Sequence, residues 1–481
     1  MSSVLNKRRN FVLALGVATS CLPVVYSVSP LVAQASERAA TVRVNSIDIS
    51  SIALQSGFGG HNTAADKEIS TLIIGGKYFA NGAYALSLYR SVRIELGEGA
   101  YYSEPVQLAN SGSCFANTMV VSPDGRWLAA ADGSMSDASV YIADLSSSNL
   151  NCSDETKLLS YPNEDQSVLR FNANSTRLWI GVPYATWQGG DWRAGPTQGF
   201  TTEFGLGFTG EWSTTRPKAG YLFGEQQAPN FNAGYGAALA FSADTNVRAV
   251  LADANRAPPS GYERNPDTPT ILLQRDGASD ALFSYTDPES MRLRVDGRLT
   301  MDAAGSTVVH ATTIDSPMPN ERFVELHTFS WISGAWERRI QSSITAFDCF
   351  GDLPNASRFR DPHAADAVLS GDGRRLAVSI YSSDNNENRA FGLCLFTRDG
   401  IGAWELLAED SQTATNALRS AIGGRFSGSS SAELGKLQAN DTLGRLLLPH
   451  KDFAAVIELE WSEVIDQTGL PIWLLYEASK S

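Results

Sequence analysis

One segment of this chain recurs with variations, and that repetition constrains the fold more than any other feature. The clearest copy begins at Ala367 with AVLSGDGRRLAVSIY and continues through FGLCLFTRDG to GAWELLA. A second copy, MVVSPDGRWLAAAD, begins at Met119. Each copy contains a strand, a Ser-x-Asp-Gly turn, a second strand, a polar loop, an aromatic strand, and a fourth strand. Repetition of a unit this long indicates a β-propeller or another repeat array.

Seven copies can be aligned along the chain, and each offers four short strands. In these strands, β-branched or aromatic residues alternate with small or polar ones, which is the pattern of a β-strand. Asp-Gly and Asn-containing pieces supply the positive φ angles that hairpin turns need. No segment after the first 35 residues has the pattern of an amphipathic helix. The copies span about 58–108, 115–160, 166–216, 234–288, 297–345, 364–410 and 425–477.

A four-stranded sheet cannot cover both of its faces alone, whereas seven sheets arranged around a channel can. We therefore predict an all-β chain with a single domain, residues 36–481, folded as a seven-bladed β-propeller of four-stranded antiparallel blades. Two β-sandwiches in tandem are the alternative, but sandwiches do not require a recurring unit. Residues 41–44 are expected to add a strand that helps to close the ring, with its partner left open.

Tryptophans recur at one place in the repeat, at the start of the last strand after a Gly-containing turn. They are Trp212, Trp336 and Trp404, with Trp473 as a near equivalent. A large ring at a repeated structural position is expected to pack between neighbouring blades. We therefore interpret these residues as structural.

The first 35 residues have the features of a signal peptide. Lys7, Arg8 and Arg9 form a basic segment, a mostly apolar run follows, and Ala33-Gln34-Ala35 matches a signal peptidase site. The mature chain is thus predicted to begin at Ser36 and to be exported, either to the periplasm or out of the cell. The paired arginines also fit a twin-arginine signal, so the export route stays open. No later run reaches the ~20 apolar residues needed to span a bilayer.

Four cysteines remain once the signal peptide is removed, and an even number in an exported protein favours disulfides. Four cysteines allow three pairings. We predict Cys114–Cys152 and Cys349–Cys394, because each pair then closes within one repeat. Free buried thiols are the alternative. The spacings do not suit zinc, which prefers closely spaced cysteine pairs.

The charge of the chain disfavours two classes of partner. Lys and Arg number 38 and Asp and Glu number 52, so the formal net charge is −14. An acidic protein repels nucleic acid and anionic lipid, so neither is expected as a partner.

The repeats resemble a known family. Leading Phe58-Gly59 and Tyr235-Gly236 pairs, the Ser-x-Asp-Gly turns and the Gly-x-Trp turns are similar to the FG-GAP repeats of bacterial exported proteins, which are related to the integrin α-chain propeller. The resemblance implies a seven-bladed propeller with a binding or adhesive role. Integrin-type blades often carry a calcium loop, but the turns at 122–126 and 370–374 offer too few oxygens for the 6–8 ligands that calcium takes. We therefore predict no cofactor and no metal.

Histidines are the first candidates for catalysis. His61, His310, His363 and His450 are expected toward the top face, defined here as the face with the connections between blades and the loops between second and third strands. The chain contains none of the Gly-x-Ser-x-Gly, His-Glu-x-x-His or Gly-Lys-Ser/Thr motifs. We assign no catalytic residue. A hydrolase or lyase acting on an extracellular polymer, with His363 and a neighbouring Asp as acid and base, is the alternative function.

The third copy supplies the candidate binding residues. Its loop contains Tyr184, Trp187, Asp191, Trp192 and Arg193 on a Gly-rich segment. Exposed rings beside planar polar groups suit stacking on sugars or gripping a peptide. The alternative is that the rings fold back over the channel or fill a blade interface. The sequence thus favours an exported, non-catalytic binding module that recognises a glycan or a protein with its top-face loops.

Overall fold

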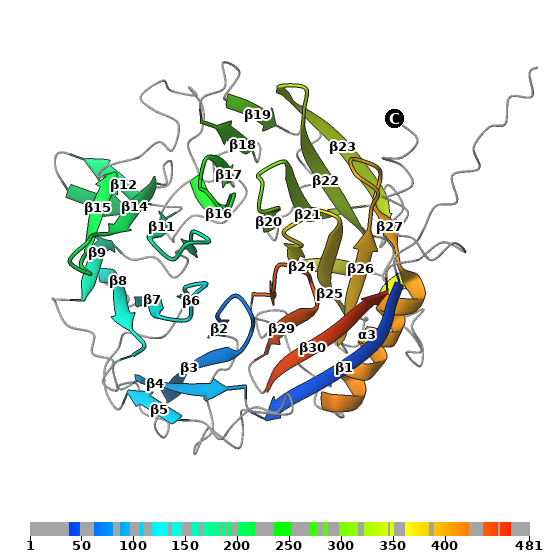
Figure 1. Cartoon of the computed structure of the whole chain (residues 1–481), viewed down its shortest axis with the longest axis horizontal. Coiled ribbons are helices and arrows are strands. Elements are labelled where there is room, and N and C mark those ends of the chain that lie inside the picture. Colours follow the sequence, from blue (N-terminus) through cyan, green and yellow to red (C-terminus); the bar gives the residue numbers. More distant parts are fainter. Residues whose placement is uncertain are drawn as a thin grey trace, which may run out of the picture. The chain divides into compact units, whose positions relative to one another are not determined.

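The repeats fold into seven antiparallel sheets of four strands, arranged as the blades of a β-propeller in this computed structural model (Figure 1). The predicted fold class is therefore confirmed. First strands of successive blades contact one another, and β2 of the first blade contacts β29 of the last. The structure describes residues 38–48, 62–79, 87–96, 106–109, 118–132, 137–146, 156–162, 168–182, 185–188, 191–194, 200–216, 235–252, 270–276, 282–286, 298–315, 322–344, 347–350, 361–383, 389–422, 436–450 and 453–462.

Six blades take their four strands from consecutive stretches of chain. The first three are β2 (Asn62–Ala65), β3 (Thr71–Phe79), β4 (Ser87–Glu95), β5 (Val106–Ala109); β6 (Thr118–Val121), β7 (Trp127–Asp132), β8 (Asp137–Asp144), β9 (Lys157–Pro162); and β10 (Val168–Phe171), β11 (Arg177–Val182), β14 (Phe200–Leu206), β15 (Trp212–Arg216). The next three are β16 (Tyr235–Phe241), β17 (Val247–Ala252), β18 (Thr270–Arg275), β19 (Leu282–Thr286); β20 (Arg298–Met301), β21 (Thr307–Asp315), β22 (Arg322–Ile332), β23 (Ala335–Ile344); and β24 (Asp361–Leu369), β25 (Arg375–Ser383), β26 (Arg389–Thr397), β27 (Glu405–Leu406).

The seventh blade closes the ring by combining the two ends of the described chain. It contains β28 (Gln438–Ala439), β29 (Arg445–Pro449) and β30 (Phe453–Ser462), and its outermost strand is β1 (Arg38–Asp48). β1 runs antiparallel to β30, with Val44 opposite Ile457. The strand expected at 41–44 thus joins the last blade. Residues 470–477, which the alignment counted with the seventh copy, lie outside the described residues.

First and second strands of every blade are joined by the same turn. The turn begins with Asp, Ser or Asn, whose side-chain oxygen accepts a hydrogen bond of 2.8 to 3.0 Å from the backbone N–H five residues later. Its fourth residue has a positive φ in every blade. This turn explains the Ser-x-Asp-Gly motif, because Ser provides the acceptor and Gly tolerates the left-handed conformation. The seven first residues are Asp66, Ser122, Asn172, Ser242, Asp302, Ser370 and Asn440.

Neighbouring turns are linked around the axis by backbone hydrogen bonds between their second residues. Ala243 donates to Ala303 at 2.8 Å, Ala303 to Gly371 at 2.9 Å, and Gly371 to Asp441 at 2.7 Å. Lys67 donates to Pro123 at 3.3 Å. These bonds pair backbone groups that face the next blade, so they hold adjacent blades in a common register.

The repeated tryptophans pack between blades, as the sequence predicts. The Trp404 indole Nε1 donates to Thr328 Oγ1 of the fifth blade at 2.9 Å. Trp336 is buried in a cluster that joins the fourth and fifth blades. Trp212 meets Trp127 of the second blade edge to face, with ring centroids 5.7 Å apart. Trp473 lies outside the described residues.

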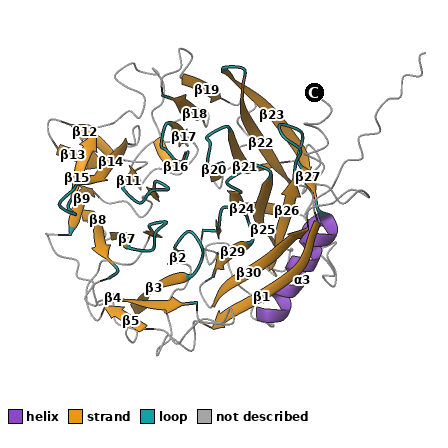
Figure 2. Ribbon diagram, viewed as in Figure 1, coloured by secondary structure: helices purple, strands orange, loops and turns teal. Residues whose placement is uncertain are grey.

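The expectation of no amphipathic helix is wrong. α3 (Ala408–Ile422) spans 15 residues and lies along β1 and β26 (Figure 2). Only Ala414 and Leu418 of this helix enter the core, so its apolar pattern is weak. It covers an edge that the two-residue β27 leaves open. The N–H groups of Leu393 and Leu395 on β26 donate to Thr415 Oγ1 at 3.0 Å and Ser411 Oγ at 2.9 Å.

The predicted disulfide between Cys349 and Cys394 is confirmed, and both residues are buried. It joins the short helix α2 (Phe347–Phe350) to β26 of the sixth blade. Cys114, Cys152 and the predicted signal peptide, residues 1–35, lie outside the described residues. Within the described part of the chain, no helix is long and apolar enough to cross a membrane.

Candidate functional site

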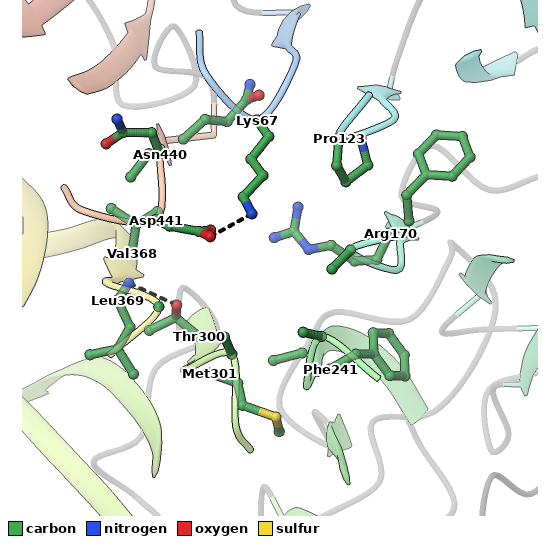
Figure 3. A pocket seen from close by; sticks show the side chains of 18 of the residues that line it. Lys67, Pro123, Arg170, Phe241, Thr300, Met301, Val368, Leu369, Asn440 and Asp441 are labelled. Atoms are coloured by element: carbon green, nitrogen blue, oxygen red, sulfur yellow. Dashed lines mark hydrogen bonds and ion pairs between the residues drawn. The ribbon is translucent and has the colours of Figure 1, made fainter. Parts of the chain in front are cut away.

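A cavity of about 320 Å³ lies at the axis, lined by first strands and turns of all seven blades (Figure 3). Because these turns join first to second strands, the cavity is at the end of the channel opposite the top face. Apolar side chains, Val120, Phe241, Leu299, Met301 and Val368 among them, share the walls with polar groups in about equal proportion. Small-molecule sites are also concave, but their walls are usually more apolar than these.

Two charged residues break the pattern of the turns that surround this cavity. The second turn residue is small or apolar in five blades, where it is Pro123, Ala173, Ala243, Ala303 or Gly371. In the first and last blades it is Lys67 and Asp441. Lys67 Nζ lies 2.5 Å from Asp441 Oδ2, and the two side chains are 37% and 54% exposed. The junction that closes the ring therefore carries an accessible ion pair.

Arg170 is a third charged group that reaches into the cavity. It stands two residues before the first residue of its turn. At the equivalent position in two other blades, the side chains of Thr300 and Gln438 bind the neighbouring blade. Thr300 Oγ1 accepts from the Leu369 N–H at 3.0 Å, and Gln438 Oε1 accepts from the Ala65 N–H at 2.9 Å. A guanidinium has no acceptor, so Arg170 cannot take that role. Figure 3 shows its side chain extending toward Lys67.

The two remaining carboxylates of the lining are bound to their own turns. Asp66 Oδ1 accepts from the N–H groups of Ser70 at 2.7 Å and Thr71 at 3.0 Å. Asp302 Oδ1 accepts from the N–H groups of Ser306 at 2.7 Å and Thr307 at 3.0 Å. The lining thus holds three carboxylates, of Asp66, Asp302 and Asp441, and two cations, Lys67 and Arg170.

The binding residues predicted from the third copy lie elsewhere. Trp187 is on β12 (Ala185–Gln188), and Asp191, Trp192 and Arg193 are on β13 (Asp191–Ala194). The two strands form a hairpin that belongs to none of the seven blade sheets, and β13 lies beside β9, the outer strand of the second blade. Trp187 is directly opposite Trp192 in the register. Tyr184 lies outside the described residues.

The structure places the described histidine side chains inside the blades. His450 is 1% exposed and stacks on Phe453, with ring centroids 4.4 Å apart. His310 and His327 are buried with ring centroids 5.8 Å apart, and His327 Nε2 lies 2.5 Å from Glu325 Oε1. Burial, and then the neighbouring His327, lower the pKa of His310 to about 3.

For the other two histidines, His61 and His363, the expected position toward the top face stays a prediction. His363 lies on β24, where its backbone pairs with Tyr381, and His61 is outside the described residues. Among the residues that the structure describes, no group of His, Cys, Asp and Glu side chains is arranged to hold a metal ion.

Lys67, Arg170 and Asp441 were not identified by the sequence analysis. A signal was present, because alignment on the first turn residue shows charged residues where other blades have small ones. That alignment requires the turn to be recognised in all seven copies, including those that begin with Asp or Asn instead of Ser.

No protein-family model matches the chain, and no curated protein matches it. Among solved structures it is similar to a periplasmic gluconolactonase of Pseudomonas aeruginosa, with 14% identity, a TM-score of 0.35, and coverage of 72% of this chain and 83% of that chain. It is also similar to a chain of the COPII outer coat vertex, with 11% identity, a TM-score of 0.45, and coverage of 85% and 86%. Hsv2 of Kluyveromyces lactis gives 10% identity, a TM-score of 0.40, and coverage of 84% and 94%. At these values the similarities carry no argument about ligand or reaction.

Proposed function

We propose that this protein is an exported, non-catalytic binding module that recognises a glycan or a protein through the hairpin β12–β13. The observation that carries the proposal is the register of this hairpin, in which Trp187 is opposite Trp192 and Thr186 is opposite Arg193. Directly opposed positions in an antiparallel pair have Cβ atoms about 4.5–5.5 Å apart. Two tryptophan positions, one arginine position and one aspartate position are thus gathered on one short ribbon.

The place of the hairpin in the fold supports a role in recognition. It is inserted between β11 and β14 of the third blade, yet both of these strands complete their sheet without it. A segment that the scaffold does not need for its own pairing is free to vary toward a ligand, as loops on rigid scaffolds commonly do. The resemblance to adhesive FG-GAP propellers and the predicted signal peptide agree with a binding role outside the cytoplasm.

The test is a glycan and polysaccharide array, screened with the purified protein and with the double variant Trp187→Ala/Trp192→Ala. We expect selective binding that the double variant loses while its melting temperature stays within a few degrees of the wild type. Phe208→Ala is the matched control, because Phe208 is a fully exposed aromatic residue near the tip of the β14–β15 hairpin of the same blade. This control should keep full binding.

Two outcomes would contradict the proposal in different ways. A large loss of stability in the double variant would assign the tryptophans to packing. Absence of array binding by the wild type would exclude the glycan form, and the same variants would then be compared in cross-linking to extracellular proteins. Cross-linking that the double variant does not change would exclude recognition by the hairpin.

A further inference from the structure

We propose that the ligand of the hairpin β12–β13 is a neutral polysaccharide, bound by the face of the ribbon that holds Trp187 and Trp192. This ligand class rests on the proposed function of the hairpin. It follows from the register of the two strands, from the residue types on each face, and from the charge of the chain.

The register of the hairpin divides its residues between two faces. Successive residues of a strand face opposite sides, and directly opposed residues of an antiparallel pair face the same side. Trp187 is opposite Trp192 and Ala185 is opposite Ala194, so these four positions share one face. The positions on the other face are Thr186, Gln188, Asp191 and Arg193.

The connection between the strands makes this division a property of the sequence. Only Gly189 and Gly190 separate β12 from β13 along the chain. A loop of two residues fixes the register of a hairpin, and a slip by one residue would exchange the two faces. Tryptophan and alanine therefore occupy every position of one face, and polar residues occupy every position of the other.

The tryptophan face suits a ligand built from sugar rings. An indole is a large planar ring with a negative face, which attracts the C–H groups on the flat side of a pyranose. Directly opposed positions have Cβ atoms about 4.5–5.5 Å apart, so the two tryptophan positions are close enough to serve neighbouring sugar residues. Ala185 and Ala194 add little bulk beside them, which leaves room for a chain of sugars along the ribbon.

Charge favours an uncharged sugar chain. The tryptophan face has no charged position, so a carboxylate or sulfate on a ligand bound there would meet no cation. The formal net charge of −14 also repels a polyanion as it approaches. A protein ligand is less suited, because a stable protein interface buries about 800 Å² on each partner, more than one face of so short a ribbon provides.

The scaffold beside the ribbon suits the polar face. β13 lies beside β9, on which Lys157 and Ser160 are exposed. Leu158 and Leu159 of β9 pack instead against the apolar cluster shared by the second and third blades. The described side chains of β9 therefore offer polar groups to the ribbon, and the tryptophan face is the one left for a ligand.

Affinity gel electrophoresis with matched neutral and anionic polysaccharides tests the proposal. The pairs are hydroxyethylcellulose with carboxymethylcellulose and dextran with dextran sulfate, and β-glucan, galactomannan and arabinoxylan extend the neutral set. We expect at least one neutral polymer to retard the protein and the anionic polymers not to do so. Retardation should persist at high salt, because no ion pair contributes to it.

Single variants on the two faces show which face binds. Trp187→Ala and Trp192→Ala should each weaken binding by about tenfold, since each removes one stacking surface. Arg193→Gln should weaken it by less than about threefold, because position 193 is on the other face. Phe208→Ala removes an exposed aromatic residue outside the ribbon and should leave binding unchanged.

The possible failures separate the ligand class from the proposed function. Preference for an anionic polymer, with a larger loss in Arg193→Gln than in the tryptophan variants, would overturn the neutral ligand but keep the hairpin as the binding site. Retardation by no polysaccharide would also overturn the neutral ligand, and would leave a protein as the ligand of the hairpin. A large fall in the melting temperature of the tryptophan variants would assign their face to packing and overturn the proposal. Binding that no hairpin variant alters would overturn the proposed function as well.

Discussion

The turns around the axis and the outer edges of the blades follow opposite rules. In every turn between a first and a second strand, a side-chain oxygen of the first residue accepts a hydrogen bond of nearly the same length, and the fourth residue has a positive φ. This holds although the first residue is Asp, Ser or Asn. The outer edges differ from blade to blade. The sixth blade has the short strand β27 and α3 at its edge, and the seventh has β1 from the other end of the described chain.

The difference shows where a repeat sequence is under geometric constraint. At the axis, seven first strands must approach each other closely, so one turn that satisfies its own amides and contacts its neighbour is repeated. At the rim, adjacent blades diverge, and any element that satisfies the last N–H groups of a sheet serves equally well. Departures from the repeat at the axis are therefore more informative than departures at the rim, which is why Lys67, Arg170 and Asp441 stand out.

The largest effect is expected from adding one methyl group to a turn at the axis. Gly305 has φ +65°, and a Cβ there would lie 2.5 Å from Val247 Cγ2. Gly125 has φ +71° at the same turn position, but its nearest neighbour would be 3.6 Å away. Gly305→Ala combines left-handed strain with overpacking and should cost about 3 kcal/mol. Gly125→Ala adds only the strain and should cost about 1 kcal/mol.

Denaturant unfolding of the two variants measures this difference. Ile69, Ser175, Thr245 and Leu443 already occupy the same turn position with positive φ, so the backbone conformation alone does not forbid a side chain. Equal losses in both variants would mean that the space beside the turn is not restrictive, and the argument for tight packing at the axis would fail.

A smaller effect is expected at the rim, where α3 covers the edge of β26 that the two-residue strand β27 leaves open. Thr415 Oγ1 accepts from the Leu393 N–H and donates to the Cys349 carbonyl at 2.7 Å. Thr415→Val keeps the shape but removes both bonds, leaving buried backbone groups unsatisfied, and should cost about 2 kcal/mol. Thr413→Val is the control on the same helix, because Thr413 is exposed and bonds only to the Glu409 carbonyl in the described contacts.

Thr413→Val should change the unfolding free energy by less than about 0.5 kcal/mol. If Thr415→Val also stays within that limit, the hydroxyl does not contribute to the stability of the edge of β26. Hydrogen exchange at Leu393 gives a second measurement, since its amide should lose protection in Thr415→Val alone.

The blades could be predicted from sequence because strand alternation and Ser-x-Asp-Gly recur together, and the Gly-x-Trp positions recur with them. α3 could not, because a helix that buries Ala414 and Leu418 beside polar and small residues has almost no apolar stripe. The hairpin β12–β13 was expected as a loop, although Gly189-Gly190 between Trp187 and Trp192 is a two-residue hairpin signal. The pairing of β1 with β30 could not be predicted, because neither strand's own sequence indicates which strand it pairs with.

The axial cavity was beyond a residue-by-residue analysis of the sequence. Lys67 and Asp441 are 374 positions apart, and each is an ordinary polar turn residue when considered singly. The predicted disulfide Cys349–Cys394 is the opposite case, because a pairing of two cysteines within one repeat can be predicted from residue type alone. The pairing of Lys67 with Asp441 can be seen only in the closed ring.

His310 is a departure from the repeat at a position inside a blade. Its place in the repeat, eight residues after the first turn residue, is apolar in every other blade. The equivalents are Ile74, Ala130, Ile180, Val250, Val378 and Leu448, all fully buried. His310 lies directly opposite His327 on the neighbouring strand β22, and Glu325 pairs with His327. A titratable ring thus occupies a position at which the other six blades have a buried apolar side chain.

The pKa of His310 lies near 3 in the folded protein, against an ordinary value of 6.5, because burial disfavours the charged ring. The unfolded chain therefore takes up a proton first as the pH falls, and stability is lost between about pH 6.5 and 3. From pH 7 to pH 5 this one residue should cost about 2 kcal/mol. His310→Val restores the apolar residue of the repeat and should reduce the pH dependence of the unfolding free energy by that amount. An unchanged pH dependence would contradict this prediction. It would mean that His310 is protonated in the folded protein, or that the titration of another group changes by an equal amount in the variant.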